Sequence, residues 1–308
     1  RINIAGLCIQ IEEGVFPLSL EDLPCHFKFR DGPGLEPPAA QLNLSFTTEA
    51  APKNLAGPLC RNEIWELWQD ECGNFIFTQP AQTPQRWVLV NPDFTAGRIF
   101  GDFGALKGEP FFPLKYLDIV LYSNWLALRG DLILHASGVI WEDAACVFMG
   151  NSGAGKSTLA ADLQAAHGLT VLGEDQIIIR RVDDKFIAFG TPWHEDPTRC
   201  DPRGVPLGKL FFLDRAADRT LTPLSGFDAA VRIMTTAFVP YYLPARVQAI
   251  LENVARLTAE HTAFVGILEF REKSPQHGQI RELFQGIPRQ RIQALSLRQC
   301  VGQPIDRR

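Results

Sequence analysis

Residues 150–157 read Gly-Asn-Ser-Gly-Ala-Gly-Lys-Ser and fit the pattern G-x-x-x-x-G-K-[ST]. This run sets the strictest limits on the fold, because such a loop works only between a buried strand and the first turn of a helix. Both neighbours are present: Ala145–Met149 is apolar throughout and predicts a central strand, and Lys156–His167 predicts a helix that ends at Gly168. The sequence therefore predicts an α/β fold with a phosphate-binding loop at one end of its sheet.

Each part of the loop has a task in holding phosphate. Gly150, Gly153 and Gly155 permit backbone angles that turn successive N–H groups inward, and the following helix adds its positive dipole end. Lys156 is expected to reach the β/γ-phosphates and Ser157 to hold Mg²⁺. ATP and Mg²⁺ are therefore the expected cofactors, and the expected nucleotide contacts are Gly150, Asn151, Ser152, Gly153, Ala154, Gly155, Lys156, Ser157 and Thr158.

A phosphate loop alone does not distinguish an ATPase, a GTPase and a kinase. The sequence has neither the N-K-x-D motif of GTPases nor a long apolar strand ending in Asp-Glu far downstream. Instead, the short apolar run Leu169–Leu172 is followed closely by Glu174 and Asp175. Adjacent carboxylates point to opposite faces of an extended chain, so one could bind Mg²⁺ while the other receives a proton from a hydroxyl. The alternative is a pair that only caps a turn.

Two expected hairpins indicate which side chains reach the loop. If Glu142-Asp143 is a two-residue turn, His135 falls opposite Gly150, where it could face a transferred phosphoryl group. A second turn at Asp183-Asp184 would bring residues 190–196 level with the two carboxylates. The alternatives are a histidine that only packs in its strand and an ordinary connecting loop.

Residues 1–108 are predicted to form a smaller β-rich domain, and residues 109–308 the phosphate-binding domain. Turn-forming clusters such as Asp31-Gly32-Pro33-Gly34 alternate in the first part with short apolar runs, which indicates a meander of short strands. The expected strands there are 42–46, 64–68, 75–77 and 87–90. The second part is expected to contain helices over 114–128, 156–167 and 244–261, and strands over 132–141, 145–149, 169–172, 176–181, 185–189, 209–213 and 264–270.

Composition excludes several classes of protein. The chain carries 30 Lys+Arg against 35 Asp+Glu, a net charge of −5, and has no basic block, so nucleic-acid binding is not expected. No stretch approaches the roughly 18 apolar residues of a membrane span, so no membrane association is expected. The seven cysteines form no C-x-x-C pair and no zinc-type spacing, which indicates reduced thiols and a cytoplasmic protein.

His135, the loop 150–157 and the run Leu172-Gly173-Glu174-Asp175 together resemble the HPr kinase/phosphorylase family, whose P-loop kinases share the phosphoenolpyruvate carboxykinase-like fold. The likeness covers about residues 132–181. The part that follows looks more like HPr-kinase-related proteins such as lasso-peptide kinases. The resemblance implies a mixed sheet and a kinase that moves the γ-phosphoryl of ATP to a hydroxyl, either a Ser of a peptide or small protein or a small molecule. It also implies that the chain could form a homo-oligomer.

The resemblance further implies a role for each matching residue. Lys156 would hold the β/γ-phosphates, Ser157 would bind Mg²⁺, and His135 would face the transferred group. Asp175 would be the catalytic base or a metal ligand, and Glu174 would take the other of these two roles. Contacts to substrate, to a second metal or to transition-state charge are expected from His194, Glu195, Arg199 and Arg203.

Two other functions remain open at this point. Glu174 stands where the family's pattern has Asp, and the family's second signature, I-E-V-R-G-x-G, is absent. These departures favour a regulatory module that binds nucleotide without transferring phosphate. A carboxykinase-like reaction on an oxoacid comes last, because it needs an extra metal and several positive substrate groups, and the chain has eight lysines and no Lys/His metal pair.

Overall fold

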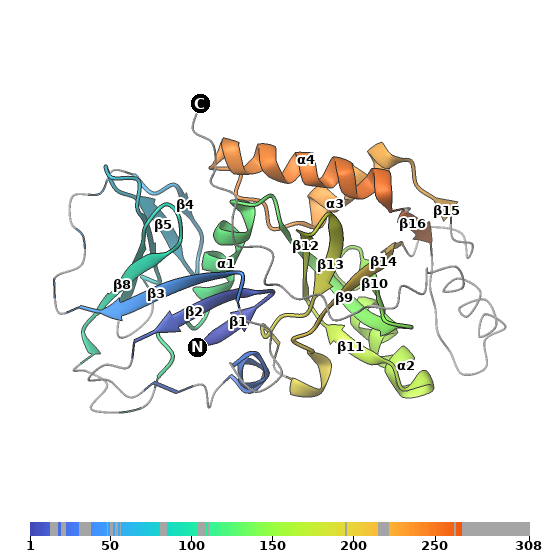
Figure 1. The fold of residues 1–308 in the computed structure, drawn as a ribbon, viewed down its shortest axis with the longest axis horizontal. Helices are drawn as coiled ribbons and strands as arrows, with labels where there is room; N and C mark the ends of the chain where they lie inside the picture. Colours follow the sequence, from blue (N-terminus) through green and yellow to red (C-terminus); the bar gives the residue numbers. More distant parts are fainter. Residues whose placement is uncertain are drawn as a thin grey trace. The chain divides into compact units, whose positions relative to one another are not determined.

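The computed structural model describes residues 1–12, 18–19, 23–30, 38–47, 49, 52, 55, 57–80, 85–103, 109, 111–194, 196–214, 222–261 and 263–266. Its contacts divide the chain into two compact units, with the division between Trp125 and Leu126 (Figure 1). No helix in the described part of the chain is both long and apolar enough to cross a membrane.

The first unit contains an eight-stranded sheet in the order β1-β2-β3-β8-β7-β6-β5-β4. The expected strands lie at β3, β5, β6 and β7. The predicted meander is confirmed for β4 to β8, which pair antiparallel in chain order, and is wrong for β3, which pairs in parallel with both β2 and β8. A local pattern shows where a strand lies and not which distant strand it joins. The strands are β1 (Ile2–Ile4), β2 (Leu7–Ile11), β3 (Ala40–Phe46), β4 (Cys60–Arg61), β5 (Glu66–Gln69), β6 (Phe75–Thr78), β7 (Arg86–Val90) and β8 (Ala96–Gly101).

Helix α1 (Asp118–Ala127) packs against this first sheet. The ring of Trp125 stacks on Phe94 with centroids 6.2 Å apart, and the Tyr122 hydroxyl donates to the backbone oxygen of Leu7 at 3.0 Å. These contacts place most of α1 in the first unit, so the division comes after this helix begins and not at residue 108. Helix formation could be read from the local pattern, whereas the choice of packing partner could not.

The second unit is built on a mixed sheet in the order β10-β9-β12-β13-β14-β16-β15, with β11 paired to β9. A further parallel pairing of β10 with β14 closes β9, β10, β12, β13 and β14 into a small barrel. The strands are β9 (Leu132–Trp141), β10 (Ala144–Met149), β11 (Thr170–Gly173), β12 (Gln176–Val182), β13 (Lys185–Phe189), β14 (Gly204–Leu213), β15 (Thr222–Pro223) and β16 (Ala263–Gly266). The helices are α2 (Lys156–His167), α3 (Gly226–Thr236) and α4 (Pro244–Glu260), with a short 3₁₀ helix at Pro197–Arg199.

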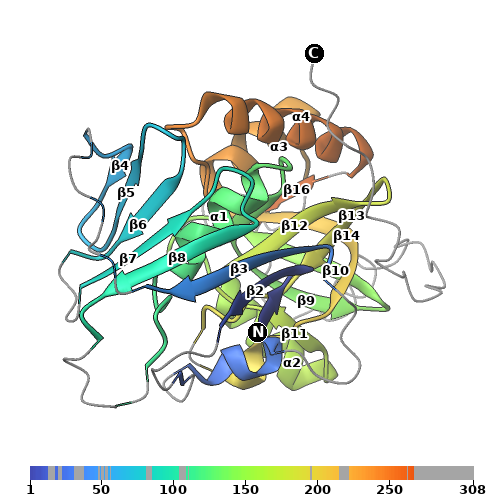
Figure 2. The same cartoon turned by 60° about the vertical axis from the view of Figure 1, so that its left-hand side comes forward.

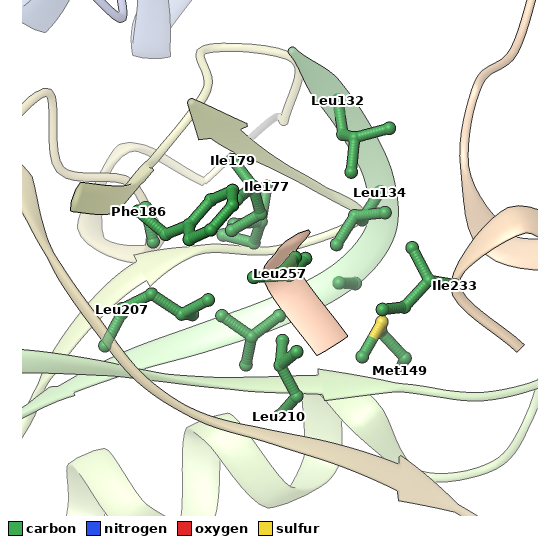
Figure 3. Packing of buried hydrophobic residues seen from close by; sticks show 14 of the residues in the cluster. Leu132, Leu134, Met149, Ile177, Ile179, Phe186, Leu207, Leu210, Ile233 and Leu257 are labelled. Atoms are coloured by element: carbon green, nitrogen blue, oxygen red, sulfur yellow. The ribbon is translucent and has the colours of Figure 1, made fainter. Parts of the chain in front are cut away.

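Strand β10 is apolar throughout because both of its faces are buried. Its residues Ala145, Val147 and Met149 pack with α3 and α4 in the larger hydrophobic core, part of which Figure 3 shows. The intervening residues Cys146 and Phe148 pack with α2 in the smaller core. In both ribbon views α4 lies on one side of these strands and α2 on the other (Figures 1 and 2). The phosphate loop therefore follows a strand that is held from both sides.

Both predicted hairpins have the expected register. The turn residues Glu142 and Asp143 have φ of 45° and 69°, and Asp183 and Asp184 have φ of 48° and 60°. Two successive positive φ angles are typical of the type I′ turn, which joins antiparallel strands with a two-residue loop. Met149 accordingly pairs with Ala136, and Ile178 with Phe189. The observed registers therefore agree with the ones used to predict which residues lie near the loop.

The helix predictions at α2 and α4 are confirmed. Helix α2 spans Lys156–His167 and ends at Gly168, whose φ of 66° is the left-handed conformation of a C-terminal cap. Helix α3 was not expected, and β14 begins five residues before the predicted start at Lys209. The predicted strand 264–270 is described only as far as Gly266, and its remainder lies outside the described residues.

Candidate active site

The loop that leaves β10 has the backbone that the glycine spacing predicts. Gly150, Gly153 and Gly155 have φ of 147°, 75° and 99°, conformations that side chains other than glycine rarely adopt. A Cβ at Gly150 would also lie 2.6 Å from the backbone oxygen of Leu213, so this position requires glycine for space as well as for angle. Gly155 caps α2 without a side-chain hydrogen bond, so no side chain caps the first turn of the helix there. Such a helix end is suited to bind an anion.

The side chain of Lys156 folds back over this loop. Its Nζ donates to the backbone oxygens of Gly150 at 3.0 Å and Asn151 at 3.3 Å, and the residue is only 7% exposed. Burial lowers the pKa of Lys156, and the charge of Asp175 raises it to a smaller extent. The ammonium is thus held by two carbonyls that phosphate oxygens could replace. Asp175 lies at the same end of the sheet as this loop, because its backbone oxygen accepts from Ala136, which pairs with the last residue of β10.

His135 and Asp175 meet where β9 and β12 begin to pair. Gln176 pairs with His135, and the His135 Nδ1 lies 3.1 Å from the backbone oxygen of Asp175. Because a carbonyl oxygen can only accept, the Nδ1–H group of His135 is the donor in this contact. Met149 pairs with Ala136, so His135 lies at the strand position level with Gly150, as the hairpin register predicts.

Asp175 has an unusual backbone. Its φ is 64°, and the Gln176 N–H donates to the Glu174 oxygen across it at 2.7 Å, which is the pattern of a rare and strained γ-turn. The Asp175 carbonyl accepts from the Ala136 N–H at 3.1 Å as well as from His135, and these two bonds fix the turn. The carboxylate itself is exposed. The expectation that Glu174 and Asp175 lie on an extended chain is therefore wrong, although their side chains do separate into one buried and one exposed group.

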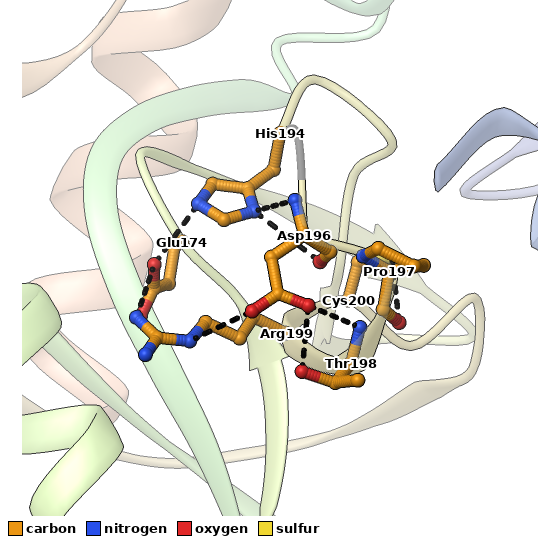
Figure 4. Close-up of polar contacts among 7 residues, drawn as sticks. All are labelled: Glu174, His194, Asp196, Pro197, Thr198, Arg199 and Cys200. Carbon is orange, nitrogen blue, oxygen red and sulfur yellow. Dashed lines mark hydrogen bonds and ion pairs between the residues drawn. The ribbon is translucent and has the colours of Figure 1, made fainter. Parts of the chain in front are cut away.

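Glu174 is the buried member of the pair, with its side chain only 3% exposed. Its Oε1 lies 3.0 Å from the Arg199 Nη1, and its Oε2 lies 3.0 Å from the His194 Nε2 (Figure 4). The His194 Nδ1 accepts from the Asp196 N–H at 3.0 Å, so Nε2–H donates to Glu174. Both carboxylate oxygens are therefore engaged. Glu174 therefore anchors the segment that carries His194 and Arg199, and neither of its oxygens is left for the predicted role of catalytic base or metal ligand.

The segment 190–200 returns to the end of β11, as the second hairpin predicts. The Thr191 hydroxyl donates to the Gln176 backbone oxygen at 2.9 Å, and Asp196 accepts from the Thr198 N–H at 2.8 Å. Hydrogen bonds from Thr198 are the main cause that lowers the pKa of Asp196. A Cβ at Gly190 would lie 2.0 Å from the Leu172 backbone oxygen, so only glycine permits this close approach. From the sequence alone, Gly190 is recognisable only as part of a loop.

Arg203 does not join the other predicted residues. Its side chain forms two hydrogen bonds with Asp201, both 2.9 Å, and these chiefly raise the pKa of Arg203, with a smaller contribution from the charge of Asp143. Asp143 lies in the turn at the start of β10, whose six residues span about 20 Å before Gly150. The predicted role of Arg203 beside the phosphates is therefore not supported by its position. Glu195 lies outside the described residues.

The metal-binding prediction involves only two protein ligands. Ser157 is the second residue of α2 and is half-buried, and Thr158 is exposed beside it. Among the residues that the structure describes, no three His, Cys, Asp or Glu gather in a group that could hold a metal. Mg²⁺ at nucleotide sites commonly takes one or two protein ligands together with phosphate oxygens and water, so Ser157 and Asp175 fit that donor set.

No protein-family model matches the chain. No curated protein sequence matches it either.

Proposed function

We propose that this protein is an ATP- and Mg²⁺-dependent kinase of the HPr-kinase-like P-loop type, which transfers the γ-phosphoryl group to a hydroxyl. The observation that carries the proposal is the placement of His135 and Asp175 at the same sheet end as Lys156 and the left-handed glycines of the loop. A phosphate loop by itself would support nucleotide binding only. An exposed carboxylate beside the loop lysine adds a group that can take a proton from an acceptor.

The chain's residues suit a bound nucleotide. The loop N–H groups and the start of α2 would hold phosphate oxygens, and the Lys156 ammonium would exchange the carbonyls of Gly150 and Asn151 for them. Ser157 and Asp175 would hold the metal. Mg·ATP, when bound, supplies the phosphoryl group and neutralises charge that develops on its oxygens.

We assign Asp175 the role of the base that takes the proton of the acceptor hydroxyl. As the attacking oxygen bonds to phosphorus and the bond to the ADP oxygen breaks, the exposed carboxylate accepts the proton of the hydroxyl. The hydrogen bond from His135 to the Asp175 carbonyl keeps the strained turn in place, and we assign the histidine ring the role of facing the transferred group. Glu174 holds the loop that carries His194 and Arg199, and so positions the acceptor side of the site.

A regulatory module that binds nucleotide without phosphoryl transfer is the second candidate. The observation that favours it is the engagement of both Glu174 oxygens, which leaves Asp175 as the one carboxylate for both metal binding and proton transfer. The two candidates differ in turnover and not in nucleotide binding.

The decisive experiment incubates the protein with Mg·ATP and candidate Ser-containing peptides or small hydroxyl compounds, and records intact masses. We expect an added phosphoryl group with the wild-type protein and with Arg203→Ala, and none with Lys156→Ala. Nucleotide affinity is measured on the same samples. Tight Mg·ATP binding by the wild-type protein with no phosphoryl group added to any acceptor would reject the kinase and favour the regulatory module. Product formation that Asp175→Asn does not reduce would reject the assignment of Asp175 as the base.

Acceptor, location and assembly are parts of the same proposal. The expected partner is a peptide, a small protein or a small molecule with a hydroxyl group, and a homo-oligomer is expected from the resemblance. We also propose a cytoplasmic location, where ATP is available and thiols stay reduced. The described cysteines, at positions 8, 25, 60, 72, 146 and 200, form no disulfide with one another.

A further inference from the structure

The barrel of the second unit carries a cavity of about 450 Å³ that is separate from the phosphate loop. It opens beside the Glu142–Asp143 turn, at the end of β10 that is remote from Gly150, and β14 forms one wall through Pro206–Lys209. Its size falls in the range of small-molecule sites, roughly 300–1,000 Å³. None of its lining residues belongs to the loop or to the network around Glu174.

The inner wall of this cavity is mainly aromatic and carries one ammonium group. Phe186 and Leu207 are buried, and the His261 ring meets Phe186 edge-on with centroids 5.7 Å apart. The Lys209 Nζ lies 5.9 Å from the centroid of the Phe264 ring. Burial lowers the pKa of Lys209 and also that of His261, whose ring hydrogen-bonds to the Gly208 backbone. A ligand that enters the cavity therefore meets flat apolar surfaces and a partly desolvated cation.

The rim has the opposite charge. Four exposed carboxylates surround the opening, with the exposed Lys185 among them: Glu142, Asp143, Asp184 and Glu260. Solvent screens these exposed charges, whereas the half-buried Lys209 is screened less. A purely cationic ligand would be repelled by Lys209, and a purely anionic ligand would have to pass the acidic rim. The charge pattern favours a ligand that carries both charges.

We propose that this cavity binds a small aromatic zwitterion of the α-amino-acid type. Its ring packs against Phe186 and Phe264, its carboxylate pairs with Lys209, and its ammonium faces the carboxylates of the rim. Aromatic rings stack on one another at centroid separations of about 4.5–7 Å, and a carboxylate held by a partly desolvated ammonium makes a strong charge-assisted hydrogen bond. The proposal does not depend on the kinase assignment.

The test uses three probes that share one ring and differ only in charge. L-Phenylalanine, 3-phenylpropionate and phenethylamine are titrated separately into the full chain, and binding is measured by ligand-observed NMR. We expect L-phenylalanine to bind most tightly, with a Kd of about 0.1–1 mM for a ligand of this size. Phenethylamine, which cannot pair with Lys209, is expected to bind most weakly.

Variants locate the site. Lys209→Met is expected to weaken L-phenylalanine binding about tenfold or more. The matched control is Lys115→Met, because Lys115 lies over the Tyr116 ring at 5.7 Å in the first unit and should leave binding unchanged. If Lys209→Met does not fold, as judged by circular dichroism, Phe264→Leu replaces it and is expected to weaken binding several-fold. Lys156→Ala should have no effect.

Several results would overturn the proposal. The first two concern the probes: no binding by any of them, or equal binding of L-phenylalanine and phenethylamine. The other two concern the variants: unchanged binding in a folded Lys209→Met or Phe264→Leu protein, or a loss of binding in Lys156→Ala. The last result would place the amino acid at the phosphate loop. A failed kinase assay would leave every one of these measurements informative.

Discussion

Removing Arg199 should destabilise the protein, because it leaves the buried Glu174 carboxylate without its cationic partner. The Glu174 side chain is 3% exposed and would keep only the hydrogen bond from His194. A buried ion pair that loses one partner typically costs about 3–5 kcal/mol. The Arg199 side chain is 34% exposed, so water already screens the pair, and we expect a smaller loss of about 1–3 kcal/mol in Arg199→Met.

A second variant, Glu174→Gln, distinguishes the cost of an unpaired buried charge from the cost of the lost contact. Glu174→Gln removes the carboxylate charge, and the partly exposed Arg199 can then turn to water, so we expect a loss of about 1 kcal/mol. The double variant should lose less than the sum of the two single losses, because each single change removes the same interaction. Arg203→Met is the matched control, since its ion pair with Asp201 is a surface pair worth about 0–1 kcal/mol.

The free energy of unfolding is measured by urea denaturation for the wild type and all four variants. Urea midpoints are compared at a constant slope, so that changes report stability rather than compactness. The reasoning is refuted if Arg199→Met costs no more than Arg203→Met, or if the losses in the double variant are additive within about 0.3–0.5 kcal/mol. Either result would mean that Glu174 does not anchor the loop through Arg199.

Three further predictions concern Gly150 in the glycine-rich loop, Asp175 in its turn, and His261. Gly150→Ala should lower the free energy of unfolding by about 1–3 kcal/mol in urea denaturation, because its φ is 147° and its Cβ would meet Leu213. Gly57→Ala, where a Cβ meets nothing within 4 Å, should be nearly neutral, and equal losses in the two variants would show that Gly150 is not required for its backbone angle. Asp175→Asn should keep its fold, since Asn tolerates a φ of 64°, but should lower phosphoryl transfer about 10²-fold or more, as measured by product mass over time at saturating Mg·ATP. Unchanged transfer would exclude Asp175 as the base. Burial lowers the pKa of His261 below its usual value of 6.5, so the unfolded chain binds a proton at this histidine first, and stability should fall as pH decreases below about 6.5. His261→Gln should make the urea midpoint fall less steeply between pH 7 and pH 5. An unchanged slope would show that His261 does not contribute.

Much of the second unit could be predicted from local patterns. The turn dipeptides Glu142-Asp143 and Asp183-Asp184 each leave room for only two residues between apolar runs, and side chains alternate strictly along a strand. Together these two facts set the pairing of four strands and the level of His135 beside Gly150, and both outcomes are confirmed. The three glycines of the loop likewise have the left-handed angles that their spacing predicts.

Other elements were missed because their signals are weak or depend on distant partners. Helix α3 begins with Ser225 capping the Asp228 N–H at 3.1 Å, a signal that its Ser-x-x-Asp spacing could have shown. The first half of β14 contains Gly204, Pro206 and Gly208, which disfavour a strand locally, yet Val205 and Pro206 pair with β13. Here the barrel's closure overrides local propensity.

The sequence by itself determined that a glycine-rich loop joins an apolar strand to a helix, and that His135 and the Glu174-Asp175 pair lie at the same end of the sheet as this loop. The alternation of side chains along a strand and the length of a turn are local properties, so one sequence is enough to predict them. Only the tertiary structure decided how the two acids differ. Glu174 is held by His194 and Arg199, which follow it by 20 and 25 residues, and Asp175 is turned out beside Lys156 by hydrogen bonds from β9. Whether a carboxylate serves as an anchor or as a base depends on which cations and donors surround it in space, and this depends on the packing of segments that are distant in the chain.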